Sequence, residues 1–298
     1  MDNRFLPLVV GAVMLALGLT LTVGDFRRAA TVRRPLAIAL VCQSLVLPAL
    51  CWVIAESLHL TPNLAVGLML MAATPGGMLA NVVSHLARGD LALNLTVTAI
   101  NAVLSIFTIP AILAFSLTWF LGEGRFIPLQ FDKFFGVFAM VLVPVAIGVA
   151  IRHRFPDFAR RLQKFVRVAA AVLLILAVVG GIASGQSTLW KDFGVISAAV
   201  ASFCAVSLTV GYLVSRRMQL GPPQAIAVSL EIGLHNAVVA IGIALSPQLL
   251  NNAEMAMPAT VYGIIGPLIA LAFIVAVRRL DPAYRELASS RAGEAATT

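Results

Sequence analysis

Long apolar stretches separated by short charged clusters make up almost the whole chain. Nine of these stretches are about 20 residues or longer, the length that an α-helix needs to cross a hydrocarbon layer of roughly 30 Å. They lie near residues 5–24, 35–57, 62–86, 90–120, 133–151, 164–185, 192–215, 221–247 and 255–277. This pattern predicts an all-α integral membrane protein with nine transmembrane helices.

Composition agrees with a membrane protein. Hydrophobic residues make up 60% of the 298 positions and charged residues 11%, whereas a soluble domain carries about 25% charged residues. No soluble core could bury so much apolar surface, so the lipid bilayer is the expected environment. Three cysteines lie in apolar spans without paired spacing and are expected to be packing residues: Cys42, Cys51 and Cys204.

Basic residues gather in alternate loops. When nine spans are counted, all of the 21 Lys and Arg residues except Arg4, Arg125, Lys133 and Lys191 fall on one side. Loops rich in Lys and Arg stay cytoplasmic. The N-terminus is therefore expected outside and the C-terminus in the cytoplasm, with the protein in the plasma membrane, or the inner membrane of a bacterium. The same bias accounts for the net charge of +8 without a nucleic-acid partner.

Glu231 is the only acidic residue deep inside an apolar span. A carboxylate at membrane depth costs several kcal/mol unless it is compensated, so such residues commonly mark ion or proton pathways. This position indicates that the chain is a transporter.

Two spans carry features that interrupt a helix. In the span at 62–86, Pro75 removes a backbone donor, and Gly76 and Gly77 tolerate an unwound backbone. In the span at 221–247, a break is inferred from Gly233 and the polar residues around it. Paired broken helices near the bilayer midplane often hold the binding site of a transporter. The alternative is that both spans are ordinary kinked helices.

An inverted repeat is also indicated. Placing Asn81 over Asn236 aligns the apolar residues that follow each of them, and the loop count runs the two spans in opposite directions. The expected repeats cover about 5–120 and 133–280, within one transmembrane transporter domain at 1–285. The segment at 286–298, rich in Ala, Ser, Thr and charge, is expected to be a disordered cytoplasmic tail.

The span at 90–120 carries a polar stripe. Its members are spaced four, three, four and three residues apart, which places them on one helix face: Asn94, Thr98, Asn101, Ser105 and Thr108. Such a stripe either binds neighbouring helices or lines a wet path. Asn94 and Thr98 follow a short turn and can fold back beside Asn81. Their oxygens suit a small hard cation.

At these residues the sequence resembles the bile acid:sodium symporter family, over nearly the whole chain. The matching motifs, in order, are Gly18-Leu19-Thr20-Leu21, Asp25-Phe26, Gln43 with Pro48, Thr74 to Asp90, and Glu231 to Asn236. The resemblance implies five-plus-five inverted helices, divided into a panel and a core that holds two crossing discontinuous helices. A nine-span chain would correspond to that fold without its first helix.

The resemblance further implies sodium-coupled transport. The first sodium site would comprise Ala80, Asn81, Asn94, Thr98 and Glu231; the second would comprise Gln43, Glu231, His235 and the backbone carbonyls of Ile232 and Leu234. Ala80 and Asn94 stand where the family has serines, and His235 stands where it has a glutamine. Because an imidazole offers only nitrogen, sodium is expected at the first site and the second site is left open.

His235 also raises an alternative coupling ion. It lies four residues after Glu231, so the two side chains would meet if the helix continued through them. A buried pair of this kind could bind and release a proton, because histidine titrates near neutral pH. Otherwise a neutral His235 would donate one hydrogen bond to Glu231 or to a carbonyl. A proton-coupled or uncoupled anion carrier or exporter on the same fold is therefore the alternative to sodium symport.

The family binds organic anions, and a small organic anion is the expected substrate. Half-helix N-termini at the breaks carry partial positive charge suited to a carboxylate or sulfate. Asn236 is expected to donate to the substrate and Asn81 mainly to orient the ion site, while the apolar part of the ligand would face Met78, Leu79 and Leu234. Bile-acid-like anions and small carboxylates are both open.

An alternative from another class is an intramembrane enzyme with a metal site at Glu231, His235 and His85. His85 ends its span beside Arg88, and no third ligand follows at helical spacing. The chain is therefore not expected to be an enzyme.

Overall fold

The computed structural model describes residues 5–122, 131–163, 165, 192–246 and 249–285. Within these ranges the chain is built from helices joined by short turns. In chain order they are α1 (Phe5–Thr20), α2 (Val23–Arg28), α3 (Arg33–Val41), the π-helical turn η1 (Cys42–Val46), α4 (Leu47–Ser57), α5 (Pro62–Ala73), α6 (Met78–Leu86), α7 (Leu91–Leu121), α8 (Phe131–Arg154), α11 (Phe193–Arg217), α12 (Pro222–Gly233), α13 (Ala237–Leu245) and α14 (Ala253–Leu280).

Several of these helices match the predicted membrane spans. Among the described residues, four continuous helices are long and apolar enough to cross a membrane: Arg33–Ser57, which joins α3, η1 and α4, and Leu91–Leu121, Phe193–Arg217 and Ala253–Leu280. The predicted all-helical architecture is therefore confirmed for the described residues, and its apolar helices are compatible with a membrane transporter. The span expected at 164–185 falls, apart from one residue, outside the described residues, so the full count of nine stays a prediction.

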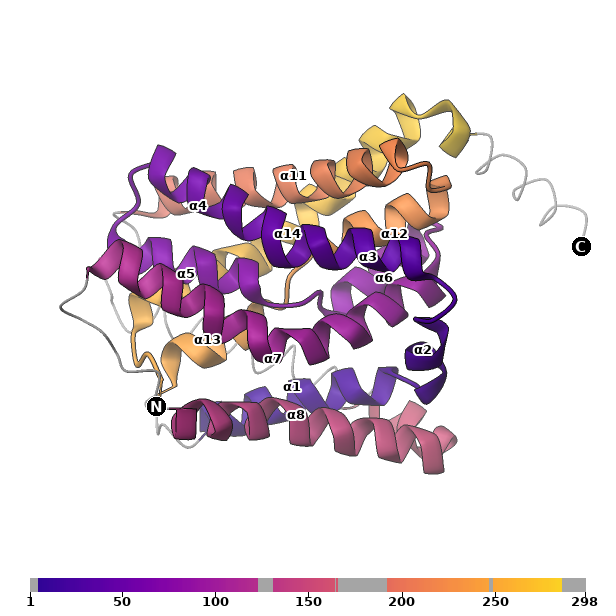
Figure 1. Cartoon of the computed structure of the whole chain (residues 1–298), viewed down its shortest axis with the longest axis horizontal. Helices are drawn as coiled ribbons and strands as arrows, with labels where there is room; N and C mark the ends of the chain where they lie inside the picture. The colour runs from indigo at the N-terminus through magenta and orange to yellow at the C-terminus, as the bar shows by residue number, and fades with distance from the viewer. Residues whose placement is uncertain (1–4, 123–130, 164, 166–191, 247–248, 286–298) are drawn as a thin grey trace, which may run out of the picture.

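The helices lie in two groups (Figure 1). α1 and α8 pack on each other and lie together along one side of the molecule. The larger group contains α3 to α7 and α11 to α14, and α13 makes the main contact from this group to α1. The two broken helices belong to the larger group.

α5 and α12 are the most deeply buried elements of the larger group. Ten of the 12 residues of α5 are buried, and nine of the 12 residues of α12. α7 and α14 pack against α5, while α11, α6 and α7 pack against α12. A helix that is apolar on all sides is stable only when it is surrounded in this way. The C-terminal ends of α5 and α12, where the two breaks begin, therefore lie inside the protein.

Both predicted helix breaks are present. α5 ends at Ala73 and α6 starts at Met78, while α12 ends at Gly233 and α13 starts at Ala237. The matching pieces have equal lengths, 12 residues for α5 and α12 and nine for α6 and α13. The two interrupted spans are therefore built to the same plan.

The helix bounds correct the register inferred from sequence. Gly77 is the N-cap residue of α6, and Asn236 is the N-cap residue of α13. Asn236 therefore corresponds to Gly77, and Asn81 lies four residues further along, inside α6. The sequence match followed the apolar residues after each asparagine, which recur at helical spacing and so permit a shift of about one turn.

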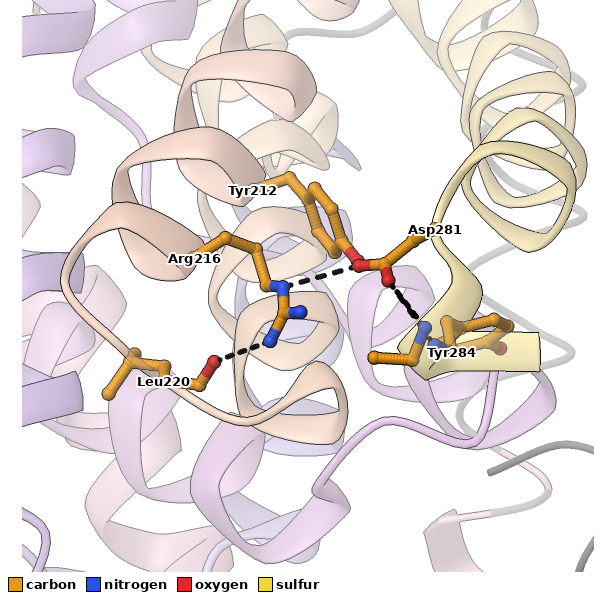
Figure 2. Close-up of polar contacts among 6 residues, drawn as sticks. Tyr212, Arg216, Leu220, Asp281 and Tyr284 are labelled. Atoms are coloured by element: carbon orange, nitrogen blue, oxygen red, sulfur yellow. Dashed lines mark hydrogen bonds and ion pairs between the residues drawn. The ribbon is translucent and has the colours of Figure 1, made fainter. Parts of the chain in front are cut away.

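A cluster of polar residues, distant from the breaks, connects the ends of three helices (Figure 2). The Arg216 guanidinium at the end of α11 lies 3.2 Å from the Asp281 carboxylate, which follows α14, and donates to the Leu220 carbonyl at 3.0 Å. The Tyr212 hydroxyl also donates to Asp281. Tyr284 donates to the carbonyl of Ala87, just after α6. The cluster therefore joins α11, α14 and the end of α6.

Candidate functional site

The two helix breaks are hydrogen-bonded to each other. The Gly77 N–H donates to the Leu234 carbonyl at 3.0 Å, and the Asn236 N–H donates to the Pro75 carbonyl at 3.0 Å. Between these bonds Gly76 and His235 form an isolated antiparallel bridge. Unwound backbone at membrane depth is tolerated only where its polar groups find partners inside the protein. Each break therefore supplies the partners that the other one lacks.

Glu231 lies directly beside this junction. Its side chain is fully buried on the last turns of α12. Oε2 accepts the Thr98 hydroxyl of α7 at 2.7 Å, and Oε1 has no hydrogen-bond partner among the described residues. A Cβ atom built on Gly76 would lie 2.3 Å from Oε1. The absence of a side chain at position 76 is therefore what lets the carboxylate approach the break.

Asn94 and Asn81 extend this contact towards α6. The Asn94 amide nitrogen lies 3.0 Å from the Asn81 Oδ1. If the Asn94 amide is rotated by 180°, its nitrogen donates to the Ala227 carbonyl at 2.8 Å and its oxygen accepts from the Asn81 backbone N–H at 3.3 Å. The rotated form gives both amide atoms suitable backbone partners and places the Asn94 oxygen 3.0 Å from the Asn81 Oδ1. It also turns an oxygen towards the space shared by α6 and α7.

The structure thus brings together four of the five side chains expected at the first sodium site. Thr98 contacts Glu231, and Asn94 contacts Asn81 one turn before Thr98 on the same helix. The Thr98 hydroxyl is also 2.9 Å from the Asn94 carbonyl, which links the two pairs. Ala80 is buried beside them but offers no side-chain oxygen. The proximity that the family resemblance implies for these four side chains is therefore present, and sodium binding there stays a prediction.

Gln43 reaches the same junction from η1. Its Nε2 donates to the carbonyls of Ala72 and Thr74 at 3.0 and 3.1 Å, at the end of α5. Its Oε1 is buried and has no partner among the described residues. π-Helical turns inside α-helices occur frequently at functional sites. Here the turn places Gln43 against carbonyls that the break in α5 leaves without helical partners.

His235 binds the Thr74 carbonyl, not Glu231. Its Nδ1 lies 2.9 Å from this oxygen and must carry the hydrogen, because a carbonyl only accepts. The ring stacks on Phe203 with centroids 5.1 Å apart, and Nε2 has no partner among the described residues. The expected Glu231–His235 contact is not formed because α12 ends at Gly233, so helical spacing does not extend to His235.

Ile232 and Leu234 were expected to contribute backbone carbonyls. Ile232 is the penultimate residue of α12 and is fully buried. The Leu234 carbonyl already accepts from the Gly77 N–H at 3.0 Å. Both residues therefore lie at the break, and one of the two carbonyls has a protein donor.

Three of the residues expected to line the substrate and ion sites lie at the two helix N-termini that follow the breaks: Asn236, Met78 and Leu79. Asn236 caps α13, where its Oδ1 accepts from the Val239 N–H at 3.3 Å, which leaves its Nδ2 hydrogens to donate elsewhere. Met78 and Leu79 form the first turn of α6, and Leu79 is exposed. Asn81 lies further inside α6, and Leu234, also expected to face the substrate, follows the end of α12.

Tyr262 is a residue of the site that sequence reasoning missed. From α14 its hydroxyl donates to the Gly233 carbonyl and accepts from the His235 N–H at 3.3 Å. Cys204, expected only to pack, also lies 3.7 Å from the Gly233 carbonyl. A single buried tyrosine in an apolar span gives no periodic signal. Its role becomes visible only when its hydroxyl is seen to bridge the break.

The residues proposed for an enzymatic metal site do not come together. His85 is exposed at the end of α6, while His235 and Glu231 are buried at the break. Among the described residues there is no group of three His, Cys, Asp or Glu side chains that could hold a metal ion. The three cysteines, all described, are free and buried.

Comparison with known proteins identifies the family. The model of the sodium bile acid symporter family matches residues 7–192, which is more than half of the chain. The chain therefore belongs to the sodium bile acid symporter family, whose members are transporters and not enzymes.

Named relatives come from plants, bacteria and animals. The chain is 29% identical over 253 residues to the probable sodium/metabolite cotransporter BASS2, chloroplastic, of Oryza sativa subsp. japonica, a match that covers 85% of the chain and 58% of that protein. It is 26% identical over 249 residues to the sodium-dependent transporter YocS of Bacillus subtilis, covering 81% and 74%. It is 23% identical over 259 residues to the human ileal sodium/bile acid cotransporter, covering 84% and 72%.

Proposed function

We propose that this protein is a secondary active transporter that carries a small organic anion together with sodium by alternating access. The observation that carries the proposal is the fully buried Glu231 carboxylate, which has one oxygen on Thr98 and one without a partner among the described residues. A buried carboxylate oxygen of this kind needs a proton or a cation. The names of the relatives, which are sodium-dependent transporters or sodium cotransporters, favour sodium.

The sodium ion would bind Glu231 together with Asn81, Asn94 and Thr98. Carboxylate, amide and hydroxyl oxygens are the ligands that small hard cations prefer. The four side chains come from α6, α7 and α12, and two contacts already hold them together, Asn94 with Asn81 and Thr98 with Glu231. Bound sodium would therefore tie the second half of one broken helix to the first half of the other.

The anion would bind next to the sodium ion, at the N-termini of α6 and α13. Each N-terminus follows a break and presents backbone N–H groups with partial positive charge. Asn236 would donate its Nδ2 hydrogens to the substrate, Asn81 would orient the ion site, and Met78 and Leu79 would face the apolar part of the anion. Bile-acid-like anions and small carboxylates both fit this arrangement, and the relatives' names include bile acid and metabolite carriers.

The two broken helices would belong to inverted repeats covering about residues 5–120 and 133–280. The equal lengths of α5 and α12, and of α6 and α13, support this, as does the antiparallel bridge between the breaks. α1 and α8 would form part of a panel that moves against the larger group. From the basic loops, the protein would lie in a plasma membrane with its N-terminus outside and its C-terminus in the cytoplasm.

Uptake into proteoliposomes tests the proposal. Radiolabelled taurocholate, as a bile-acid anion, and lactate, as a small carboxylate, would be offered with an inward sodium gradient and with a matched potassium gradient. We expect one of these anion classes to accumulate only with sodium. Accumulation that follows a proton gradient and ignores sodium would instead favour the proton-coupled alternative, and equal uptake in both salts would favour an uncoupled carrier.

A further inference from the structure

Three buried acceptor atoms without partners among the described residues belong to side chains that reach the break between α5 and α6: Gln43 Oε1, Glu231 Oε1 and His235 Nε2. Gln43 and His235 both donate to the Thr74 carbonyl, at 3.1 and 2.9 Å, so their side chains are neighbours. Glu231 lies against Gly76, two residues after Thr74. Buried acceptor atoms normally have a partner, so these three indicate a site for a cation or for a molecule that donates hydrogen bonds.

His235 makes this group a poor second site for sodium. Its Nδ1 is used by the Thr74 carbonyl and its ring face stacks on Phe203, so Nε2 is the ring atom left to bind a ligand. A hard cation such as sodium binds oxygen in preference to imidazole nitrogen. A residue at position 235 with a side-chain oxygen in place of Nε2 would give the second site a further oxygen ligand, as Gln43 does with its Oε1.

Two of the backbone carbonyls at the break in α12 already have protein donors. The Leu234 carbonyl accepts from the Gly77 N–H, and the Gly233 carbonyl accepts from the Tyr262 hydroxyl. Of the ligands that the resemblance implies for the second site, this leaves the side-chain oxygens of Gln43 and Glu231 and the Ile232 carbonyl, and Glu231 is already required by the first site. His235 therefore adds a nitrogen to this set, where a hard cation prefers oxygen.

We infer that one sodium ion binds per chain, at Asn81, Asn94, Thr98 and Glu231, and that His235 closes the second cation position. This inference rests on the proposed function and deepens it by setting the ion stoichiometry. One sodium ion transported with one singly charged anion moves no net charge. The transport cycle of this protein for a monovalent anion would therefore be electroneutral.

Equilibrium binding of radioactive sodium (²²Na⁺) to the purified full chain in detergent tests the inference. The wild-type protein should bind one ion per chain at saturation. The His235→Gln variant should bind two, because the glutamine amide can turn an oxygen to the place of Nε2. The double variant Gln43→Leu/His235→Gln is the matched control and should return to one ion, since it removes the other oxygen of the same position.

The outcomes separate this inference from the proposed function. Two ions on the wild-type protein would overturn the inference and leave sodium coupling intact, whereas no bound sodium would overturn both. A His235→Gln variant that still binds one ion would show that His235 is not what closes the position. If this variant fails to fold, the slope of wild-type Tm against the logarithm of sodium concentration distinguishes one ion from two.

Discussion

Thr98 of α7 donates its hydroxyl hydrogen to Glu231 of α12 at 2.7 Å, across 133 residues of sequence. Both side chains are fully buried. The bond connects a continuous helix with a broken one at the level where the breaks meet. A cation that binds Glu231 would therefore interact with a carboxylate that is already hydrogen-bonded to α7. Ion binding would in this way influence how α7 and α12 pack.

Replacing Thr98 with valine should weaken sodium binding while keeping the shape of the side chain. A hydrogen bond to a charged group contributes about 1.5–3 kcal/mol, so we expect the sodium concentration for half-maximal stabilisation to rise at least tenfold. The measurement is a sodium titration of Tm in detergent. Thr96→Val is the matched control, because Thr96 is equally buried on α7 but donates to the Ala92 carbonyl. Equal shifts in both variants would contradict a role of Thr98 at the ion site.

Alanine at position 76 should disrupt the ion site. Its Cβ would lie 2.3 Å from the Glu231 carboxylate and 2.6 Å from the Glu231 carbonyl, so the junction must shift. Overpacking of this kind costs about 1–3 kcal/mol, and we expect a lower Tm together with loss of the sodium effect.

Gly77→Ala is the control for this substitution. A Cβ at position 77 would meet its nearest neighbour, Asn236 Cα, at 3.6 Å, an ordinary contact. This variant should keep the sodium-dependent shift in Tm. Loss of the shift in Gly77→Ala, or its retention in Gly76→Ala, would show that the close approach at Gly76 does not shape the site.

The cluster in Figure 2 should make stability depend on pH at low values. Burial acts to raise the pKa of Asp281, but the hydrogen bond from Tyr212 and the charge of Arg216 outweigh it, so this pKa lies below its ordinary value of 3.8. A carboxyl group with a lowered pKa stabilises the fold above its ordinary pKa. That contribution is lost as pH falls through the lowered value.

The Asp281→Asn variant should therefore show a smaller decrease in Tm than the wild-type protein when the pH is lowered from 5 towards 3. Asp157→Asn serves as the control, because the Asp157–Arg160 pair is solvent-exposed and contributes little. If the Asp281 and Asp157 variants follow the same pH curve, the cluster at the end of α14 does not contribute in this way.

The sequence predicted the breaks, and singled out Glu231, because both depend on local chemistry; the full set of residues for the first ion site came from the family resemblance and stays a prediction. Pro75 with Gly76 and Gly77 cannot continue a helix, and an acidic residue such as Glu231 is too costly to bury without a function. The spacing of Asn94 and Thr98 placed both on one helix face, where the structure has them.

Other parts of the site depend on tertiary contacts that local pattern does not encode. His235 was expected to meet Glu231 at helical spacing, but the helix ends between them and the imidazole turns to Thr74. The pairing of the two breaks and the bridge made by Tyr262 join segments far apart in the chain. The register between Asn81 and Asn236 failed for a related reason, since apolar residues repeat once per turn.

The central claim is that sodium binds at Glu231, and the Tm of the purified protein in sodium chloride against potassium chloride at equal ionic strength tests it most directly. Sodium at ten times its Kd should add about 1.4 kcal/mol to the free energy of unfolding. This gain should disappear in Glu231→Gln and persist in Glu254→Gln. Glu254 is the control because it lies at the start of α14, where its carboxylate accepts hydrogen bonds from Thr61 and Asn63. Identical Tm values in the two salts, or an undiminished sodium effect in Glu231→Gln, would contradict the claim.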